Sequence, residues 1–186
     1  ELSTTIYVRF APDTPGVNSG DITHETTELP ETVLVALSGT ALETEPTNHV
    51  SDFRLAGQNG NTFHLSWHEN SGEAGAEGYL LLFTQTTAQT PIDGETPTED
   101  TDFSDGDALI VIDTDTTAAE VYIPGSETRW YTQIIPYRGS DETTNVKTDG
   151  TIPETVLITP LDDLPNAWIN EFHYSDSVDD HARVEI

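Results

Sequence analysis

The fold is decided by the stretch Thr62-Phe63-His64-Leu65-Ser66-Trp67, in which polar and apolar residues alternate one by one. A period of two places Phe63, Leu65 and Trp67 on one face of an extended chain, which is the pattern of a half-buried β-strand. Helical periodicity is nearly absent, and further strand-like stretches occur at residues 6–10, 33–37, 130–135, 156–158 and 168–174. The pattern predicts an all-β protein.

Two denser apolar runs occupy residues 79–83 and 109–112. Runs of this kind are typical of strands that are covered on more of their surface. Clusters of Gly, Pro, Asp and Asn, such as residues 11–16 and 58–61, separate the strands. Many short strands with such spacers indicate an antiparallel β-sandwich.

The chain carries a formal charge of −28, from 34 Asp and Glu against 6 Lys and Arg, and Lys147 is its only lysine. A surface this negative repels phosphate, which excludes nucleic acid and anionic membrane faces as partners. At about 1 M salt, repulsion between carboxylates is screened beyond roughly 3 Å. Acidity spread along the whole chain therefore predicts adaptation to concentrated salt. A calcium-binding surface or an ordinary acidic secreted protein are the alternatives.

Cysteine is absent, so disulfides, thiolate nucleophiles and Cys-ligated zinc are excluded. No apolar run approaches the ~18–20 residues that cross a bilayer, and we expect no membrane insertion. The first residues lack the basic and apolar regions of a signal peptide. The last four residues, Arg183-Val184-Glu185-Ile186, have the pattern of a strand that continues. We therefore expect the sequence to be an excerpt from a longer protein.

Two polar, proline-containing breaks divide the chain, one at residues 44–50 and one at residues 159–165. The breaks predict a stub at residues 1–43, a linker at 44–50 and a central domain at 51–160. Residues 161–186 are expected to form a second linker and the first strands of another module. Only the centre is long enough for its own two-sheet core.

The central domain resembles a fibronectin type III module. The resemblance rests on Trp67 in the second strand, on Gly78-Tyr79-Leu80-Leu81-Leu82 in the third, and on Val121-Tyr122-Ile123-Pro124-Gly125 running into Arg129-Trp130-Tyr131. It implies that Trp67 and Tyr79 fill the space between two sheets. The corner tyrosine of that family falls on Trp130. No catalytic residue comes with the resemblance.

Both flanks resemble parts of other modules. Val8-Arg9-Phe10-Ala11-Pro12 and Val35-Ala36-Leu37-Ser38-Gly39-Thr40 resemble the end of a bacterial immunoglobulin-like repeat, whose first strands would precede Glu1. Residues 168–174 with Val184-Glu185-Ile186 resemble the opening of a lamin-tail domain. The resemblances imply an immunoglobulin-like sandwich with truncated β modules at both ends, from a secreted or cell-surface bacterial protein.

The best candidate for a metal site is the acidic loop, residues 100–107, with Asp100, Asp102, Asp105 and Asp107 as possible ligands of Ca²⁺. Its spacing departs by one residue from the D-x-D-x-D-G pattern of an EF-hand, and no Glu stands at the closing position. A solvated acidic loop is the simpler interpretation, so no metal or other cofactor is assigned. A second group of possible ligands combines His173 and His181 with Asp176, Asp179 and Asp180.

Two other groups of residues are better explained by a structural role than by metal or sugar binding. His64 and His68 stand four residues apart, about 13 Å on a strand, which is too far for one ion. The tryptophans, whose rings could stack on sugars, lie in strand patterns typical of a core: Trp67, Trp130 and Trp168.

The sequence contains no G-x-S-x-G motif, no phosphate-binding glycine loop and no assignable acid–base pair. The prediction is a non-catalytic spacer or interaction module whose partner is a protein or a cell-surface polymer. The alternatives are an accessory fragment of a secreted hydrolase such as an extracellular nuclease, and a carbohydrate- or calcium-dependent adhesion module. Unpaired strand edges at the truncated ends also predict strand addition.

Overall fold

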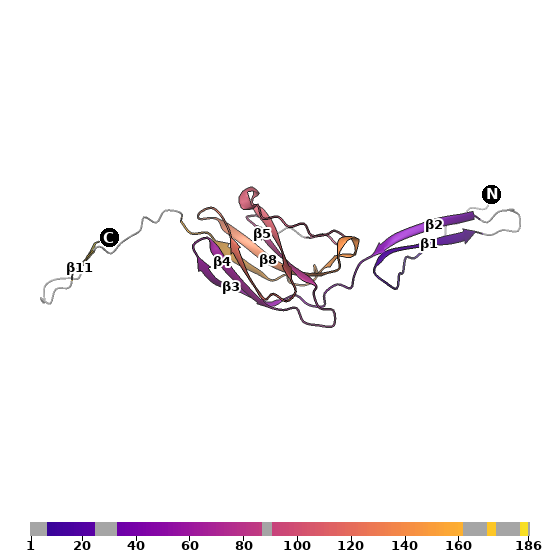
Figure 1. The fold of residues 1–186 in the computed structure, drawn as a ribbon, viewed down its shortest axis with the longest axis horizontal. Helices are drawn as coiled ribbons and strands as arrows, with labels where there is room; N and C mark the ends of the chain where they lie inside the picture. The colour runs from indigo at the N-terminus through magenta and orange to yellow at the C-terminus, as the bar shows by residue number, and fades with distance from the viewer. Residues whose placement is uncertain (1–6, 25–32, 87–90, 162–170, 174–182, 186) are drawn as a thin grey trace.

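The structure is a computed structural model that describes residues 7–24, 33–86, 91–161, 171–173 and 183–185. Twelve strands and two short 3-10 helices occur in these ranges (Figure 1). The strands are β1 Gly16–His24, β2 Val33–Ala41, β3 Ser51–Asn59, β4 Thr62–His68, β5 Gly78–Thr84, β6 Asp107–Asp113, β7 Ala118–Tyr122, β8 Arg129–Arg138, β9 Asn145–Val146, β10 Glu154–Ile158, β11 Glu171–His173 and β12 Arg183–Glu185. The helices are η1 Phe103–Asp105 and η2 Asp141–Thr143.

The centre of the chain is a sandwich of two antiparallel sheets. One sheet has the order β3-β4-β7, and the other has the order β10-β8-β5-β6 with β9 paired to the end of β8. The chain crosses between the sheets after β4, after β6 and after β7. This strand order confirms the predicted all-β, immunoglobulin-like sandwich of the fibronectin type III kind.

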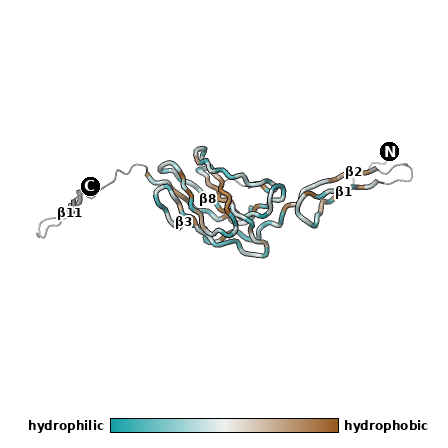
Figure 2. Tube along the Cα trace, viewed as in Figure 1, coloured by the Kyte–Doolittle hydropathy of each residue, from teal (hydrophilic) through white to brown (hydrophobic). Residues whose placement is uncertain are grey.

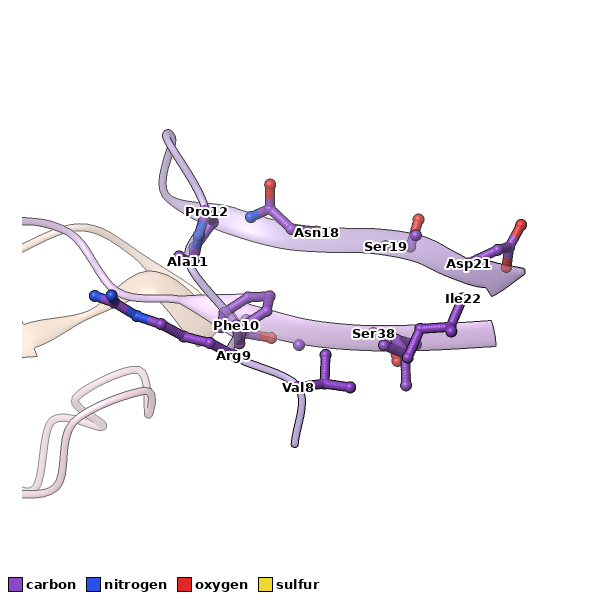
Figure 3. Close-up of a pocket in the computed structure, with 14 residues that line it drawn as sticks. Val8, Arg9, Phe10, Ala11, Pro12, Asn18, Ser19, Asp21, Ile22 and Ser38 are labelled. Carbon is purple, nitrogen blue, oxygen red and sulfur yellow. The ribbon is translucent and has the colours of Figure 1, made fainter. Parts of the chain in front are cut away.

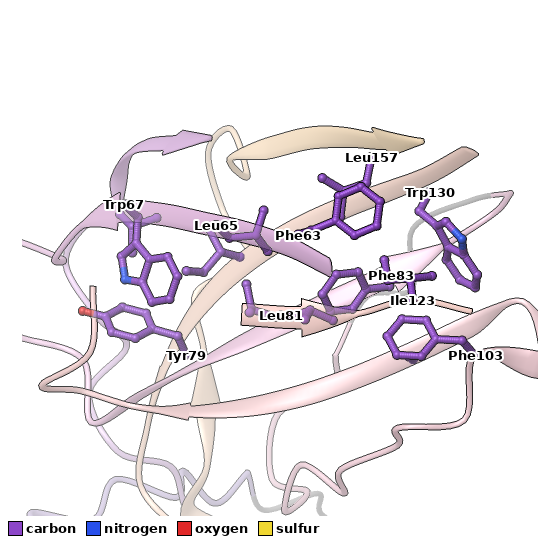
Figure 4. Close-up of a cluster of buried hydrophobic side chains, with 14 residues drawn as sticks. Phe63, Leu65, Trp67, Tyr79, Leu81, Phe83, Phe103, Ile123, Trp130 and Leu157 are labelled. Atoms are coloured by element: carbon purple, nitrogen blue, oxygen red, sulfur yellow. The ribbon is translucent and has the colours of Figure 1, made fainter. Parts of the chain in front are cut away.

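The core lies between the two sheets, and alternating residues of both supply it (Figure 4). Phe63, Leu65 and Trp67 of β4 are buried, as the opening alternation predicts. Trp67 packs edge-on against Tyr79 of β5, with ring centroids 6.0 Å apart. The predicted roles of these two residues are therefore confirmed.

The second sheet also carries a buried cluster on its outer face, made of Leu80, Leu82, Ile135 and Val146. The segment between β5 and β6 lies over this cluster, with Pro91, Ile92 and Pro97 beside Leu80 and Val146. Because both faces of β5 are covered, all seven of its residues are buried. This explains the dense apolar run at residues 79–83. Figure 2 shows strongly hydrophobic segments inside the sandwich.

The N-terminal part forms a two-stranded ribbon that projects from one end of the sandwich (Figure 1). β1 and β2 pair antiparallel over nine residues, from Gly16 opposite Ala41 to His24 opposite Val33. The strand predicted at residues 6–10 is wrong for its described part, because Tyr7–Phe10 form no strand. These residues cross the ribbon instead of pairing with it, and Phe10 lies against Gly39.

At the C-terminal end, β11 and β12 pair antiparallel over three residues, with Phe172 opposite Val184. Short strands were expected here, and the lamin-tail resemblance stays a prediction. Within the described ranges, no helix has the length and hydrophobicity needed to span a bilayer.

Candidate functional site

The acidic loop precedes β6 and is shaped by short local hydrogen bonds. Asp102 caps η1, because its Oδ1 accepts from the Ser104 backbone N–H at 2.9 Å. Gly106 ends the helix with φ +98°, a conformation that suits glycine. Asp100 pairs with Leu109 of β6 through two backbone hydrogen bonds of 2.8 Å. The loop is therefore tied to the edge of the second sheet.

Three of the four predicted ligands meet in this loop. One carboxylate oxygen from each of Asp100, Asp105 and Asp107 lies within 4.8 Å of the others. Asp102 is not in this group, because its carboxylate serves as the helix cap, and the Ser104 hydrogen bonds lower its pKa. Partial dehydration raises the pKa of Asp107, and the charges of Asp105 and Asp100 add to the rise.

Chemically, the three carboxylates offer hard oxygen ligands to a divalent cation. Two of their oxygens already accept backbone N–H groups, Asp100 Oδ1 from Asp102 and Asp105 Oδ1 from Asp107. With one oxygen each, the three carboxylates would supply three of the six to eight oxygens that Ca²⁺ takes, and carbonyls or water would have to supply the rest. Exposed acidic groups of this kind are common without an ion. The calcium site stays a prediction, now restricted to three of its four residues.

The loop has a structural role that the sequence pattern did not indicate. Phe103, in η1, is buried and packs edge-on against Phe83 and Trp130, with centroids 5.4 and 5.3 Å away (Figure 4). The aspartates around Phe103 form the turn that directs this ring into the core. An aromatic residue inside an acidic stretch was the one feature of the sequence that could have indicated that this loop packs against the core.

The other sequence candidates are structural where they are described. His64 of β4 lies opposite Glu120 of β7, with Nδ1 and Oε2 3.2 Å apart. Trp67 and Trp130 are buried, so neither ring is open to stack on a sugar. Trp130 Nε1 has no hydrogen-bond partner in the described structure. Trp130 therefore does not replace the hydrogen bond that the hydroxyl of the family's corner tyrosine makes to the backbone nearby.

Two candidates fall outside the described residues. Trp168 is one, and the second group of possible metal ligands is the other, since only the backbone of its first member, His173, is described.

The segment between ribbon and sandwich, residues 43–50, is bound along its length, and we call it the joint. The Glu43 N–H donates to the Thr143 carbonyl at 2.8 Å, and the Glu43 carbonyl accepts from Asn145 Nδ2 at 2.7 Å. Further along, Thr47 and Ala74 exchange two hydrogen bonds of 2.9 Å. The predicted linker is therefore fixed to the loops of the sandwich.

Two of the six basic residues of the chain hold the joint. Arg138 Nη2 lies 3.8 Å from Glu43 Oε2 and 3.6 Å from Glu77 Oε1. Lys147 Nζ lies 3.7 Å from Glu45 Oε1 and also contacts Asp149. The hydrogen bond to Asp149 raises the pKa of Lys147, and the same bond lowers the pKa of Asp149.

Close packing adds to these polar contacts. Val50 at the end of the joint is buried in the main core. Gly139, with φ +83°, has the Thr143 carbonyl oxygen 2.6 Å from the position that a Cβ would take, and Glu43 Cγ 3.0 Å away. Any larger residue at position 139 would displace the backbone against which Glu43 docks. From the sequence, residues 44–50 were predicted to be a polar linker, and their attachment to the sandwich was not predicted. Because basic residues are so few in this chain, Arg138 and Lys147 could have been singled out as partners of acidic residues in a fixed segment.

No protein-family model matches the chain, and no curated protein matches it. Among solved structures, the chain is similar to a fibronectin type III domain of human collagen XX, with 15% identity over 65% of this chain and 98% of that one, at a TM-score of 0.39. It is also similar to domains d3–d4 of the rat CD45 extracellular region, with 9% identity over 86% of this chain and 73% of that one, at a TM-score of 0.39. Similarities this low leave the fold assignment to the strand order.

Proposed function

We propose that this chain is a non-catalytic spacer and interaction module of a secreted or cell-surface multidomain protein adapted to high salt. The observation that carries the proposal is the joint, because a spacer transmits a fixed distance only if its connections do not bend. Its partner would be a protein or a cell-surface polymer.

The path of the chain through the sandwich supports a module in series with others. The chain enters at Ser51, and β3 then runs for nine residues, about 30 Å at ~3.3 Å per residue, to Asn59. The exit strand β10 ends beside this far end, since Gln58 Nε2 donates to the Ile158 carbonyl at 3.0 Å. The chain therefore enters and leaves the sandwich at opposite ends, as expected for modules joined end to end.

The exit is fixed as firmly as the entrance. The Thr159 N–H donates to the Thr128 carbonyl at 3.0 Å, and the Thr128 N–H donates to Thr159 Oγ1 at 2.8 Å. The Glu127 N–H donates to the Pro160 carbonyl at 3.2 Å. Contacts at both ends hold the backbone up to the point where the next module would begin.

Flanking modules complete the proposal. The ribbon would belong to an immunoglobulin-like module, with residues 1–43 as its C-terminal strands. The segment 161–186 would lead into a lamin-tail-like domain. The acidic surface suits concentrated salt, where its own repulsion is screened.

Amide hydrogen exchange in 2 M NaCl tests the joint. The N–H groups of Glu43 and Thr47 both donate to backbone carbonyls, so we expect them to exchange at least 100-fold more slowly than in an unstructured chain. Lys147→Gln should speed this exchange, whereas Arg54→Gln, which removes an exposed pair with Asp52, should not. Exchange of both amides at the unstructured rate in the unmodified chain would rule out a fixed joint.

A further inference from the structure

The sandwich has four edge strands, and three of them are protected against pairing with a further strand. The two sheets end at β3 and β7 and at β10 and β6. The pairing of β3 shifts register twice, β7 has exposed Glu120 at its centre, and β6 is bridged at Leu109 by Asp100. Irregular pairing, charge and cover are the usual protections of an edge strand. β10 carries a charge only at its first residue, Glu154.

Alternate residues of β10 direct their backbone groups away from the sheet. The Thr159 N–H donates to the Thr128 carbonyl at 3.0 Å, and the Pro153 carbonyl accepts from the Ile134 N–H at 3.2 Å. Because the bonding residues of an antiparallel pair alternate, the odd-numbered residues from 153 to 159 face β8. The N–H and C=O groups of residues 154, 156 and 158 therefore lie on the free edge.

The free edge also has exposed apolar side chains. Val156 and Ile158 are 40% and 49% exposed, because they lie on the outer face, while Leu157 between them is in the core. Within the described ranges, the one hydrogen bond to this edge comes from Gln58 Nε2 to the Ile158 carbonyl, at 3.0 Å. A carbonyl oxygen has two lone pairs, so it can accept another. The β10 edge is therefore open to strand addition.

Arg129 of β8 is an exposed cation beside this edge. It lies opposite Ile158, so both side chains are on the outer face of the sheet. The other basic residues of the sandwich, Arg54, Arg138 and Lys147, all pair with carboxylates, whereas Arg129 pairs with none among the described residues. In a chain with 34 acidic and 6 basic residues, an exposed arginine without a carboxylate favours one that is supplied from outside.

A second copy of the chain supplies that carboxylate when two β10 strands pair antiparallel about Val156. Glu154 of the second copy then lies opposite Ile158, and each opposed pair presents free backbone groups to the other. Two strand spacings of ~4.8 Å place the Cα atoms of Arg129 and this Glu154 roughly 10 Å apart, within reach of their long side chains. Within one chain, the four residues from Ile158 back to Glu154 separate the two charges by about 14 Å. The pair therefore forms between copies.

We propose that β10 is a self-association edge, at which two copies of this chain join their second sheets into one continuous sheet. Hydrogen bonds between the two β10 strands, contacts of Val156 and Ile158, and two Arg129–Glu154 pairs hold the dimer. Because the strands pair antiparallel, the two chains run through the dimer in opposite directions. This role goes beyond that of a spacer in series, since it connects two chains side by side.

The short edge limits the affinity of the dimer. Five residues at ~3.4 Å give a contact about 17 Å long. A stable interface buries roughly 800 Å² on each partner, so this contact belongs to the weak, transient class. We expect dissociation constants of roughly 0.1–1 mM, a range that neighbouring copies on one surface reach through their effective concentration.

A hollow on the ribbon is the competing surface for association. It has a volume of about 690 Å³ and separates Val8 and Phe10 from Ile22 (Figure 3). Arg9 and Asp21 also line it, so its lining is not purely apolar. Nothing in the structure shows what covers this hollow, and association through the ribbon is therefore an outcome of the test.

Disulfide trapping tests the register. The chain has no cysteine, so Val156→Cys introduces its only thiol. In the proposed dimer the two Cα atoms of residue 156 lie about 5.5 Å apart, which suits a disulfide. With oxidised glutathione as the electron acceptor, this variant should give at least about fivefold more disulfide-linked dimer than Tyr122→Cys, an exposed control on the β7 edge. Equal yields would overturn the inference.

Charge reversal tests the ion pair between copies. At about 0.5 M NaCl, distant charges are screened and direct pairs persist. Sedimentation equilibrium up to about 1 mM protein should show a monomer–dimer equilibrium. Arg129→Glu and Glu154→Arg should each raise the dissociation constant by about tenfold. The variant with both changes should return to within about threefold of the original value, because the pair is restored with its charges exchanged.

Three further results would contradict the proposal. A chain that stays monomeric at about 1 mM, or a double variant that associates as weakly as the single ones, would exclude the β10 contact. Association that survives both single reversals and is lost in Leu37→Asp would place the contact on the ribbon. Fluorescence of the buried Trp130 reports in each case whether the variant is folded.

Discussion

Lys147 lies 3.7 Å from Glu45, and this ion pair connects the only lysine of the chain to the segment that joins ribbon and sandwich. Lys147 is on the β9 side of the sandwich, where its backbone N–H also donates to the Pro136 carbonyl at 3.0 Å. Its side chain is 11% exposed, so salt screens this pair less than a surface pair. A strongly acidic protein thus places a rare cation where it holds two structural units together.

The ion pairs of Lys147 predict how the joint responds to pH. The pKa of Asp149 is lowered below its ordinary 3.8, so its stabilising effect is present above pH 3.8 and is lost as the pH falls further. The pKa of Lys147 is raised above its ordinary 10.5, so its effect is lost as the pH rises beyond that value. Exchange of the Glu43 and Thr47 amides, corrected for intrinsic rates, should therefore be slowest between about pH 4 and 10.

Asp149→Asn provides the control for this pH dependence. It should weaken the acid limb of the profile and leave the alkaline limb, because Glu45 still faces Lys147. The carboxylates of Glu43 and Glu45 are still protonated in acid in this variant, so part of the acid limb stays. An acid limb of unchanged size would mean that Asp149 does not contribute to it.

Phe103→Ala should destabilise the sandwich by about 3–5 kcal/mol, because it leaves a cavity between Phe83 and Trp130. Chemical denaturation followed by tryptophan fluorescence measures this change. Ile92→Ala, in the same connection but 64% exposed, should cost less than about 0.5 kcal/mol. Equal losses in the two variants would mean that Phe103 does not anchor the loop.

Asp107→Asn should raise the melting temperature in the absence of divalent cations. Its pKa is raised by dehydration and by two neighbouring carboxylates, so its ionised form is disfavoured in the folded state at neutral pH. Thermal unfolding in EDTA measures the shift, and Asp115→Asn is an exposed control outside the cluster. If the variant instead melted lower only when Ca²⁺ was present, Asp107 would be a calcium ligand.

The acidic surface predicts that the melting temperature rises between about 0.1 and 2 M NaCl, because salt screens the repulsion among carboxylates. Replacing exposed Glu73, Glu99 and Glu154 by their amides should raise stability at low salt and flatten the slope. A melting temperature that stays constant or falls over this range would contradict adaptation to salt.

The sequence predicted the sandwich well where alternation was regular, as in β4 and β8. It did not indicate β3, because Phe53 and Leu55 are the only large apolar residues of this strand, and no residue of β3 is fully buried. An alternation this short gives little signal for strand prediction. In β10 the pattern identified a strand but not its buried face, since Leu157 is buried while Val156 and Ile158 are 40% and 49% exposed.

The joint could not be predicted from residue patterns in the same way. Its contacts connect Glu43 and Glu45 to residues about 100 positions later, such as Asn145 and Thr148. Polar, proline-containing composition is typical of a flexible linker, and only the folded structure brings its partners within reach. The prediction for the acidic loop was right in part. The spacing identified the cluster of carboxylates, but it did not show that Asp102 caps η1.

A distance between two spin labels tests the fixed joint most directly. The chain has no cysteine, so Ser19→Cys on the ribbon and Tyr122→Cys on the sandwich would be its only labelled sites. If the eight residues of the joint were flexible, they would spread the distance by about 15 Å. We predict, in 2 M NaCl, a single peak clearly narrower than this, which broadens when Lys147 and Arg138 are both changed to Gln. A distribution as broad as 15 Å in the protein that keeps Lys147 and Arg138 would contradict the account.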